Sequence, residues 1–156
     1  MIIRKQDFAL DVDVGATSQY SQTHSLCDCS ECRNLYAQIA DKLPKLTAFL
    51  SELGLQIARP DETGSCAGED YIDYQFVSYT VIGQILDSDK YEMDMVDGGL
   101  SLKIVVDKSY IPNEQQTERY FTVTVYNIKL PWALNEPFPQ PKELSILQRI
   151  KNMLRK

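Results

Sequence analysis

The chain has 156 residues, of which 44% are hydrophobic and 24% are charged, and its net charge is −6; these values predict one globular domain over residues 1–156. The negative charge argues against a nucleic acid as the main partner, and no apolar run approaches the roughly 18 residues that a membrane-spanning helix needs. The N-terminus lacks the long apolar segment of a signal peptide, so we expect a cytoplasmic protein with no membrane partner.

The first half of the chain predicts one strand and two helices. Residues 8–14, "FALDVDV", alternate between apolar and acidic side chains, as in a half-buried strand. Residues 15–23 are small and polar, which predicts a loop. A helix is expected from the cysteine cluster onward, with Asp28 as its N-cap. Pro44 interrupts that helix and can start a second one, which Gly54 is well placed to end.

The middle of the chain changes to strand patterns. Residues 59–70, "RPDETGSCAGED", are rich in turn-forming residues and predict an acidic turn. Residues 71–86 are rich in aromatic and β-branched side chains, which favours a strand. Residues 91–107 alternate on both sides of Asp97-Gly98-Gly99, the pattern of a hairpin with its turn at these three residues.

The last third predicts a loop, a strand, a proline-rich segment and a helix. Residues 108–118 are long and polar, and residues 118–130 form a further strand pattern. Residues 131–141 contain four prolines, so we expect a segment that wraps the surface. Residues 142–156 predict a basic amphipathic helix with an apolar stripe that includes Ile150 and Leu154.

The order of these elements predicts the fold class. Strands follow one another without intervening helices, which favours an antiparallel arrangement. We therefore expect a single α+β domain with a mainly antiparallel sheet of about five strands and helices packed on one face.

The stretch "HSLCDCSECRN" carries the clearest chemical signal. Four cysteines in a cytoplasmic chain are expected to be thiols, metal ligands or redox groups rather than structural disulfides. His24, Cys27, Cys29 and Cys32 are four ligands of the types that zinc prefers. Cys66 is an alternative fourth ligand in place of His24. The spacing is unusual, because known zinc sites mostly pair ligands that are well separated in sequence.

Two other interpretations of the cluster stay open. Cys29-Ser30-Glu31-Cys32 is a Cys-x-x-Cys motif at a helix start, where the helix dipole stabilises a thiolate, so a redox role or a thiol-based sensor is conceivable. The cluster is alternatively structural: Cys32 begins the apolar stripe of the helix, and His24 is then an exposed loop residue.

Catalysis has little support in the sequence. There is no glycine-rich phosphate loop and no Gly-x-Ser-x-Gly, and a general base would have to be the single histidine. With its acidic surface, the chain is expected to be a non-catalytic binding protein for a basic protein partner. The alternative function is a zinc-binding protein or a thiol-based redox or metal sensor built on the cysteine cluster.

Three motifs carry a resemblance. "CDCSECRNLY", "LPKLTAFLSELGL" and "IKLPWALNEP" together resemble a set of small uncharacterised proteins of Gram-positive bacteria, over most of the chain. That set carries Cys-x-Cys-x-x-Cys-Arg-Asn before a helix and Leu-Pro-Trp before a proline-broken tail. The resemblance brings no activity with it, but proteins of this kind are often encoded near toxin-related loci, which implies an immunity-like binding protein.

Overall fold

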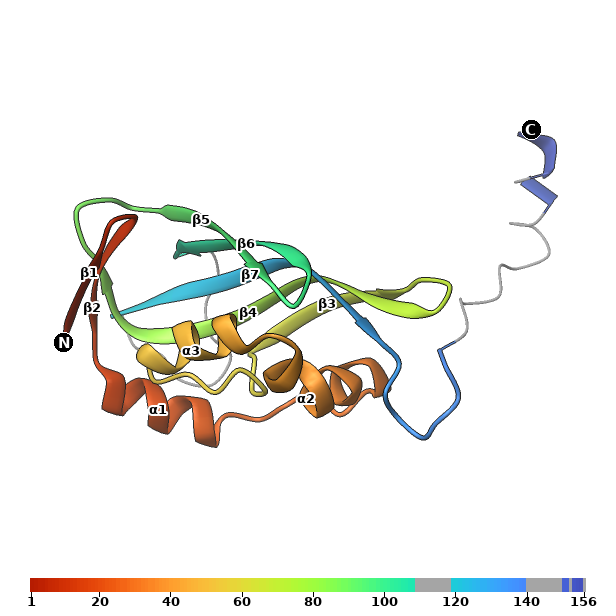
Figure 1. The fold of residues 1–156 in the computed structure, drawn as a ribbon, viewed down its shortest axis with the longest axis horizontal. Coiled ribbons are helices and arrows are strands. Elements are labelled where there is room, and N and C mark those ends of the chain that lie inside the picture. Colours follow the sequence, from red (N-terminus) through yellow and green to blue (C-terminus); the bar gives the residue numbers. More distant parts are fainter. Residues whose placement is uncertain (109–118, 140–149, 152, 156) are drawn as a thin grey trace.

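Seven strands of one antiparallel sheet and three helices make up this α+β domain (Figure 1). The computed structural model describes residues 1–108, 119–139, 150, 151 and 153–155. Strand β4 (Tyr71–Ile85) is the longest strand and pairs along one edge with β7 (Tyr120–Pro131). Its other edge is shared by β3 (Glu62–Ala67) near the start and β2 (Phe8–Val12) near the end. The long β4 strand therefore joins β3 and β2, which pair with different parts of the same edge.

Both margins of the sheet are built from hairpins. Strand β1 (Ile2–Lys5) pairs with β2, and β5 (Tyr91–Asp97) pairs with β6 (Leu100–Asp107), which in turn pairs with β7. The β5–β6 hairpin agrees with the prediction, including its turn at Gly98 and Gly99, both at positive φ. The antiparallel sheet is confirmed, but it has seven strands rather than about five.

The three helices lie on the same side of the sheet (Figure 1). They are α1 (Val14–Thr23), α2 (Ser30–Lys42) and α3 (Pro44–Glu52). One buried cluster joins α2 and α3 to the sheet, for instance Leu35 and Ile39 of α2 with Leu46 and Leu50 of α3 and alternate residues of β4. Burial of this apolar surface is the main force that holds the helices in place.

The predicted loop over residues 15–23 is wrong, because these residues form α1. Asp13 caps this helix by accepting a hydrogen bond from the Ala16 N–H at 2.9 Å. The buried face carries Thr17, Tyr20 and Ser21, which are polar or amphipathic. Thr17 donates toward and accepts from the backbone of Ile82 in β4, so the helix docks through hydrogen bonds as well as apolar contact.

The predicted turn over residues 59–70 is also wrong in its centre, where β3 pairs with β4 across a bulge between Gly64 and Ser65. Strand β1 was not expected either. Both strands are short and contain no buried residue, so they lack the apolar alternation that marks a half-buried strand. These two strands account for the difference between about five strands and seven.

The helix starts and ends are partly as predicted. Pro44 begins α3, and Gly54 follows it with φ of +89°. The N-cap of α2 is Cys29 rather than Asp28, and it makes no side-chain capping bond. Asp28 instead lies in the loop, where its carbonyl oxygen accepts from the Arg33 Nε–H at 3.1 Å.

Two predictions fall mainly outside the described residues. The polar loop at 108–118 and the basic helix at 142–156 lie largely in ranges 109–118 and 140–149, which the structure does not describe. Residues 150, 151, 153 and 154 are helical, and Ile150 and Leu154 are exposed.

Candidate metal centre

Three sulfur atoms meet where α2 begins. The Sγ atoms of Cys27, Cys29 and Cys32 all lie within 4.8 Å of one another, and this group could hold a metal ion. Cys29 directly precedes α2 and Cys32 lies in its first turn, so the helix geometry brings their side chains to one side. Cys27 and Cys29 are exposed and Cys32 is buried, so the group extends from the protein surface into the interior.

Side chains of α2 fold the cysteine loop back onto the helix. Tyr36 donates a hydrogen bond from Oη to the carbonyl oxygen of Cys27 at 3.0 Å. Arg33 donates from Nε to the carbonyl oxygen of Asp28 at 3.1 Å. These two bonds hold the peptide groups on both sides of Asp28. The backbone that carries Cys27 and Cys29 is therefore fixed against α2.

Strand β3 closes the other side of the group. The Oγ1 atom of Thr63 lies 3.1 Å from the Sγ atom of Cys32, a hydrogen bond in which either atom could donate. A cavity of about 290 Å³ opens in front of the sulfur atoms. It is lined by the three cysteines together with Tyr36, residues 60–63 and Ser65.

The pKa values of the exposed Cys27 thiol and the buried Cys32 thiol are shifted in opposite directions. The backbone N–H of Cys29 can hydrogen-bond the Cys27 sulfur, which lowers the pKa of the Cys27 thiol, and the neighbouring thiols act in the same direction. Burial raises the pKa of the Cys32 thiol to about 12. Cys32 is therefore a thiol in the absence of a cation, and a bound metal ion is the natural means of deprotonating it.

His24 is placed away from the sulfur group, in a buried structural position. Its ring nitrogens Nδ1 and Nε2 lie 2.9 and 3.0 Å from the carbonyl oxygens of Ser25 and Arg59. The ring stacks on Tyr20, with 5.1 Å between the ring centroids. Arg59 donates back to the His24 carbonyl oxygen at 2.7 Å. The interpretation of His24 as an exposed loop residue is wrong, and the structure does not bring it to the cysteines.

Cys66 is also separate from the group. It lies on β3 next to Ser65, which lines the cavity, and adjacent residues of a strand point to opposite faces. Its sulfur lies 3.8 Å from the Nε2 atom of Gln75 in β4, which donates to it. The structure thus brings together three of the five residues that the sequence singled out as ligands.

Two residues of the site were missed from the sequence alone. Tyr36 lies four residues after Cys32 on α2, so its proximity to the cluster follows from helical spacing. Thr63 had no local signal, because its position depends on the pairing of β3 with β4.

The chain segment after β7 fastens the same end of α2. The side-chain amide of Asn34 donates to Tyr74 Oη at 3.0 Å and to the Pro131 carbonyl oxygen at 3.1 Å. Its oxygen accepts from the Ala133 N–H at 2.8 Å. Arg33 forms a bidentate ion pair with Glu136. The described part of the proline-rich segment, residues 131–139, therefore supports the helix turn that carries Cys32.

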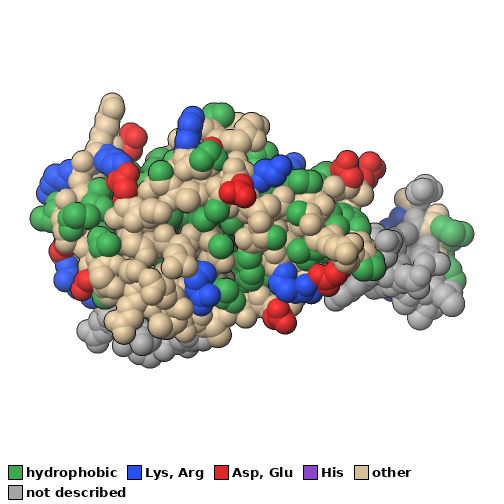
Figure 2. Space-filling view, turned by 60° about the horizontal axis from the view of Figure 1, so that its bottom comes forward, with side chains coloured by type: hydrophobic (Ala, Val, Ile, Leu, Met, Phe, Trp, Pro, Cys, Tyr) green, Lys and Arg blue, Asp and Glu red, His purple; other side chains and the backbone are tan. Residues whose placement is uncertain are grey.

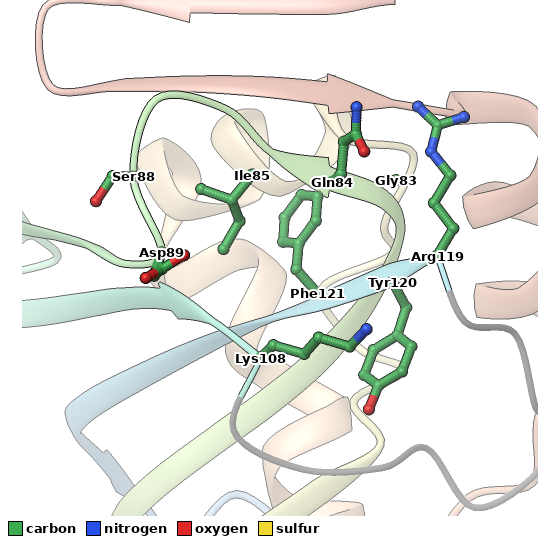
Figure 3. A pocket seen from close by; sticks show the side chains of 9 residues that line it. All are labelled: Gly83, Gln84, Ile85, Ser88, Asp89, Lys108, Arg119, Tyr120 and Phe121. Atoms are coloured by element: carbon green, nitrogen blue, oxygen red, sulfur yellow. The ribbon is translucent and has the colours of Figure 1, made fainter.

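A second cavity, of about 400 Å³, lies at the far end of β4 and β7 (Figure 3). Its two cationic side chains already have partners. Arg119 pairs with Asp11 of β2, and the Lys108 Nζ atom lies 4.6 Å from the centroid of the Tyr120 ring. In the part of the chain that the structure describes, the one group of three possible metal ligands is the cysteine group, which is therefore the better candidate site.

Comparison of the chain with protein-family models, with curated proteins and with solved structures finds no match. Among the described residues, no helix is both long and apolar enough to cross a membrane. The function must therefore be argued from the geometry of the site itself.

Proposed function

We propose that the chain is a zinc-binding protein whose ion is held by the thiolates of Cys27, Cys29 and Cys32. The observation that carries the proposal is the mutual proximity of the three Sγ atoms, all within 4.8 Å. In a tetrahedral site with Zn–S bonds of about 2.3 Å, the sulfur atoms are about 3.8 Å apart. The three thiols thus need to close by about 1 Å or less, which rotation of the two exposed side chains can supply.

The surroundings of the thiols also suit a cation. Cys29 and Cys32 lie at the N-terminus of α2, where the helix dipole would stabilise the net negative charge of a divalent ion held by three thiolates. Asp61 and Glu62 line the cavity beside the sulfur atoms. Negative groups on two sides would stabilise a bound divalent cation and would disfavour the free thiolates. This balance favours a metal site over a reactive thiol pair.

A thiol-based sensor is the second candidate, because the same three sulfur atoms are close enough to exchange disulfide bonds. It is favoured by the contrast between an exposed thiol with a lowered pKa, Cys27, and two neighbouring thiols. The two candidates differ in what protects the thiols. A metal ion protects them until a chelator is added, whereas a disulfide protects them until a reductant is added.

The test is metal content together with free-thiol count on untagged protein purified without chelator. We expect about one zinc ion per chain, with three thiols that react only after chelator is added. The variant Cys29→Ser should lose the ion. The matched control, Cys66→Ser, should retain it, because Cys66 lies outside the group. Absence of metal, with all thiols free in the native chain, would rule out the proposal.

A further inference from the structure

A tetrahedral ion held by the three cysteines has a fourth coordination position. Among the described residues, only three ligand atoms come together. Both ring nitrogens of His24 face backbone carbonyl oxygens, and the Cys66 sulfur accepts from Gln75 and is not part of the group. Zinc sites with three protein ligands and one exchangeable position are those that bind a substrate or a small ligand, whereas structural sites are closed by four.

The carboxylates beside the site are poorly placed to close it. Asp61 is held by two bonds, because one oxygen accepts from Tyr20 Oη and the other from the Thr80 N–H at 2.8 Å. Glu62 is exposed and lines the cavity, but its carboxylate does not join the sulfur group. A ligand from outside the chain can therefore reach the ion through the cavity.

The size and lining of the cavity limit the ligand. Its volume, about 290 Å³, corresponds to roughly ten water molecules, so it admits a small molecule. The hydroxyls of Thr63 and Ser65 line it. Tyr36 donates its own proton to the Cys27 carbonyl oxygen, which leaves the phenol oxygen able to accept. The wall thus offers acceptors to a ligand that carries an N–H group.

The charge of the site limits the ligand further. A divalent ion bound by three thiolates carries a net negative charge. Asp28 and Glu31 of the loop and first helical turn, and Asp61 and Glu62 of the cavity, add to it. Arg33 lies beside these groups and pairs with Asp28 at 3.6 Å and with Glu136, so its single positive charge leaves the site negative. An anionic ligand would be repelled, so a neutral donor is favoured.

We infer that the fourth position takes a small neutral nitrogen ligand of the imidazole type, coordinated to the ion and hydrogen-bonded to a hydroxyl of the cavity wall. Imidazole nitrogen is a preferred zinc ligand, and its second nitrogen can donate to Tyr36, Thr63 or Ser65. This inference rests on the proposed metal site.

The test uses the full chain loaded with Co²⁺, whose visible absorption reports the ligands around it. Titration with imidazole should shift the Co²⁺ bands saturably, and acetate at the same concentrations should leave them unchanged. If Co²⁺ binds but imidazole changes nothing, or if acetate acts equally well, the inference is overturned while the metal site stands. If no Co²⁺ binds to the cysteines, the proposed function itself fails.

Two controls ask whether the chain closes the site itself. The variants Cys66→Ser and Glu62→Gln each remove a side chain that could be a metal ligand. Glu62→Gln also removes a negative charge beside the cation and should weaken its binding, but at saturating Co²⁺ both variants should show the wild-type spectrum without imidazole. The chain has a single histidine, so the ¹⁵N signals of its ring can be assigned without ambiguity. They should be the same with and without zinc. A changed spectrum in either variant, or a zinc-dependent shift of the His24 nitrogens, would show that a protein side chain holds the fourth position.

Discussion

Asn34 shows how one residue can hold together the helix turn beneath the sulfur group. Its amide is fully buried, and its two donors and its oxygen reach Tyr74, Gln38 and the backbone of the segment after β7. A buried amide with every bond made specifies one packing, and loss of it leaves several partners unsatisfied.

We expect Asn34→Ala to lower the free energy of unfolding by about 2–3 kcal/mol, because the Ala133 N–H loses its acceptor and Tyr74 Oη loses its donor. The Pro131 carbonyl oxygen loses one of two donors and keeps Gln38. The matched control is Gln22→Ala, an exposed amide that bonds to Ser18 within α1, which should cost about 0.5 kcal/mol or less. Urea unfolding measures both values. Equal effects of the two substitutions would show that the network around Asn34 contributes little.

Ionisation of Tyr74 should make the folded chain less stable at alkaline pH. Its side chain is buried, and burial raises its pKa from 10.0 to about 12. The folded chain therefore holds this proton more tightly than the unfolded chain does. The resulting stability is fully present below pH 10 and is lost as the pH rises toward 12.

Urea unfolding at a series of alkaline pH values tests this prediction. The wild-type chain should lose stability between pH 10 and 12. Tyr74→Phe removes the titrating group, so its stability should start lower, because the bond to the Glu31 carbonyl oxygen is lost, but should fall less steeply over this range. Parallel curves for the two proteins would contradict the assignment.

At the scale of elements, the β5–β6 turn joins the sheet to the helices. Asp97 accepts a hydrogen bond from the Leu46 N–H at 2.9 Å, so it caps α3, whose own N-cap residue Leu43 makes no side-chain bond. A Cβ atom on Gly98 would lie 2.3 Å from the carbonyl oxygen of Lys42. The turn thus fits closely against the junction of α2 and α3.

The two glycines of this turn provide a matched pair. Both have positive φ, but a Cβ atom on Gly99 would meet nothing within 4 Å. Gly99→Ala should cost about 1 kcal/mol from backbone strain alone. Gly98→Ala should cost about 3 kcal/mol or more, because the clash with Lys42 adds to the same strain. Equal losses in thermal or urea unfolding would mean that the turn does not pack as described.

The elements that the sequence could predict are those with local signals. The β5–β6 hairpin combines alternation with a glycine turn, and α3 has a proline at its start and a glycine after its end. Helix α1 could not be found by apolar periodicity, since its buried face uses Thr17 and Ser21. Strand β3 owes its conformation to pairing with β4, which no local pattern reports.

Some contacts of the candidate site follow from local spacing in the sequence, and others depend on residues far apart in the chain. Cys29 and Cys32 share one helical turn, so their proximity follows from spacing alone. The exclusion of His24 depends on the carbonyl oxygen of Arg59, and the presence of Thr63 depends on β3. Contacts between residues distant in sequence therefore keep His24 out of the site and bring Thr63 into it, so the sequence could predict neither.

At the scale of the whole molecule, the acidic composition still predicts a basic protein partner, and nothing in the structure tests that prediction. On the face shown in Figure 2, acidic and basic side chains are interspersed rather than gathered into a patch of one sign. A partner bound through net charge should be recovered at low salt and lost at high salt, because salt screens the attraction. A pull-down from the native host at low and high salt measures this, and recovery of no protein at low salt would count against the prediction.

We propose that the thiolates of Cys27, Cys29 and Cys32 hold a metal ion whose fourth ligand is a nitrogen or oxygen atom. X-ray absorption at the zinc edge of the zinc-loaded chain tests it most directly. We predict three sulfur neighbours at about 2.3 Å and one nitrogen or oxygen neighbour at about 2.0–2.1 Å. Four sulfur neighbours would place Cys66 or a second chain in the site, and a shell without sulfur would contradict the assignment of Cys27, Cys29 and Cys32 as ligands.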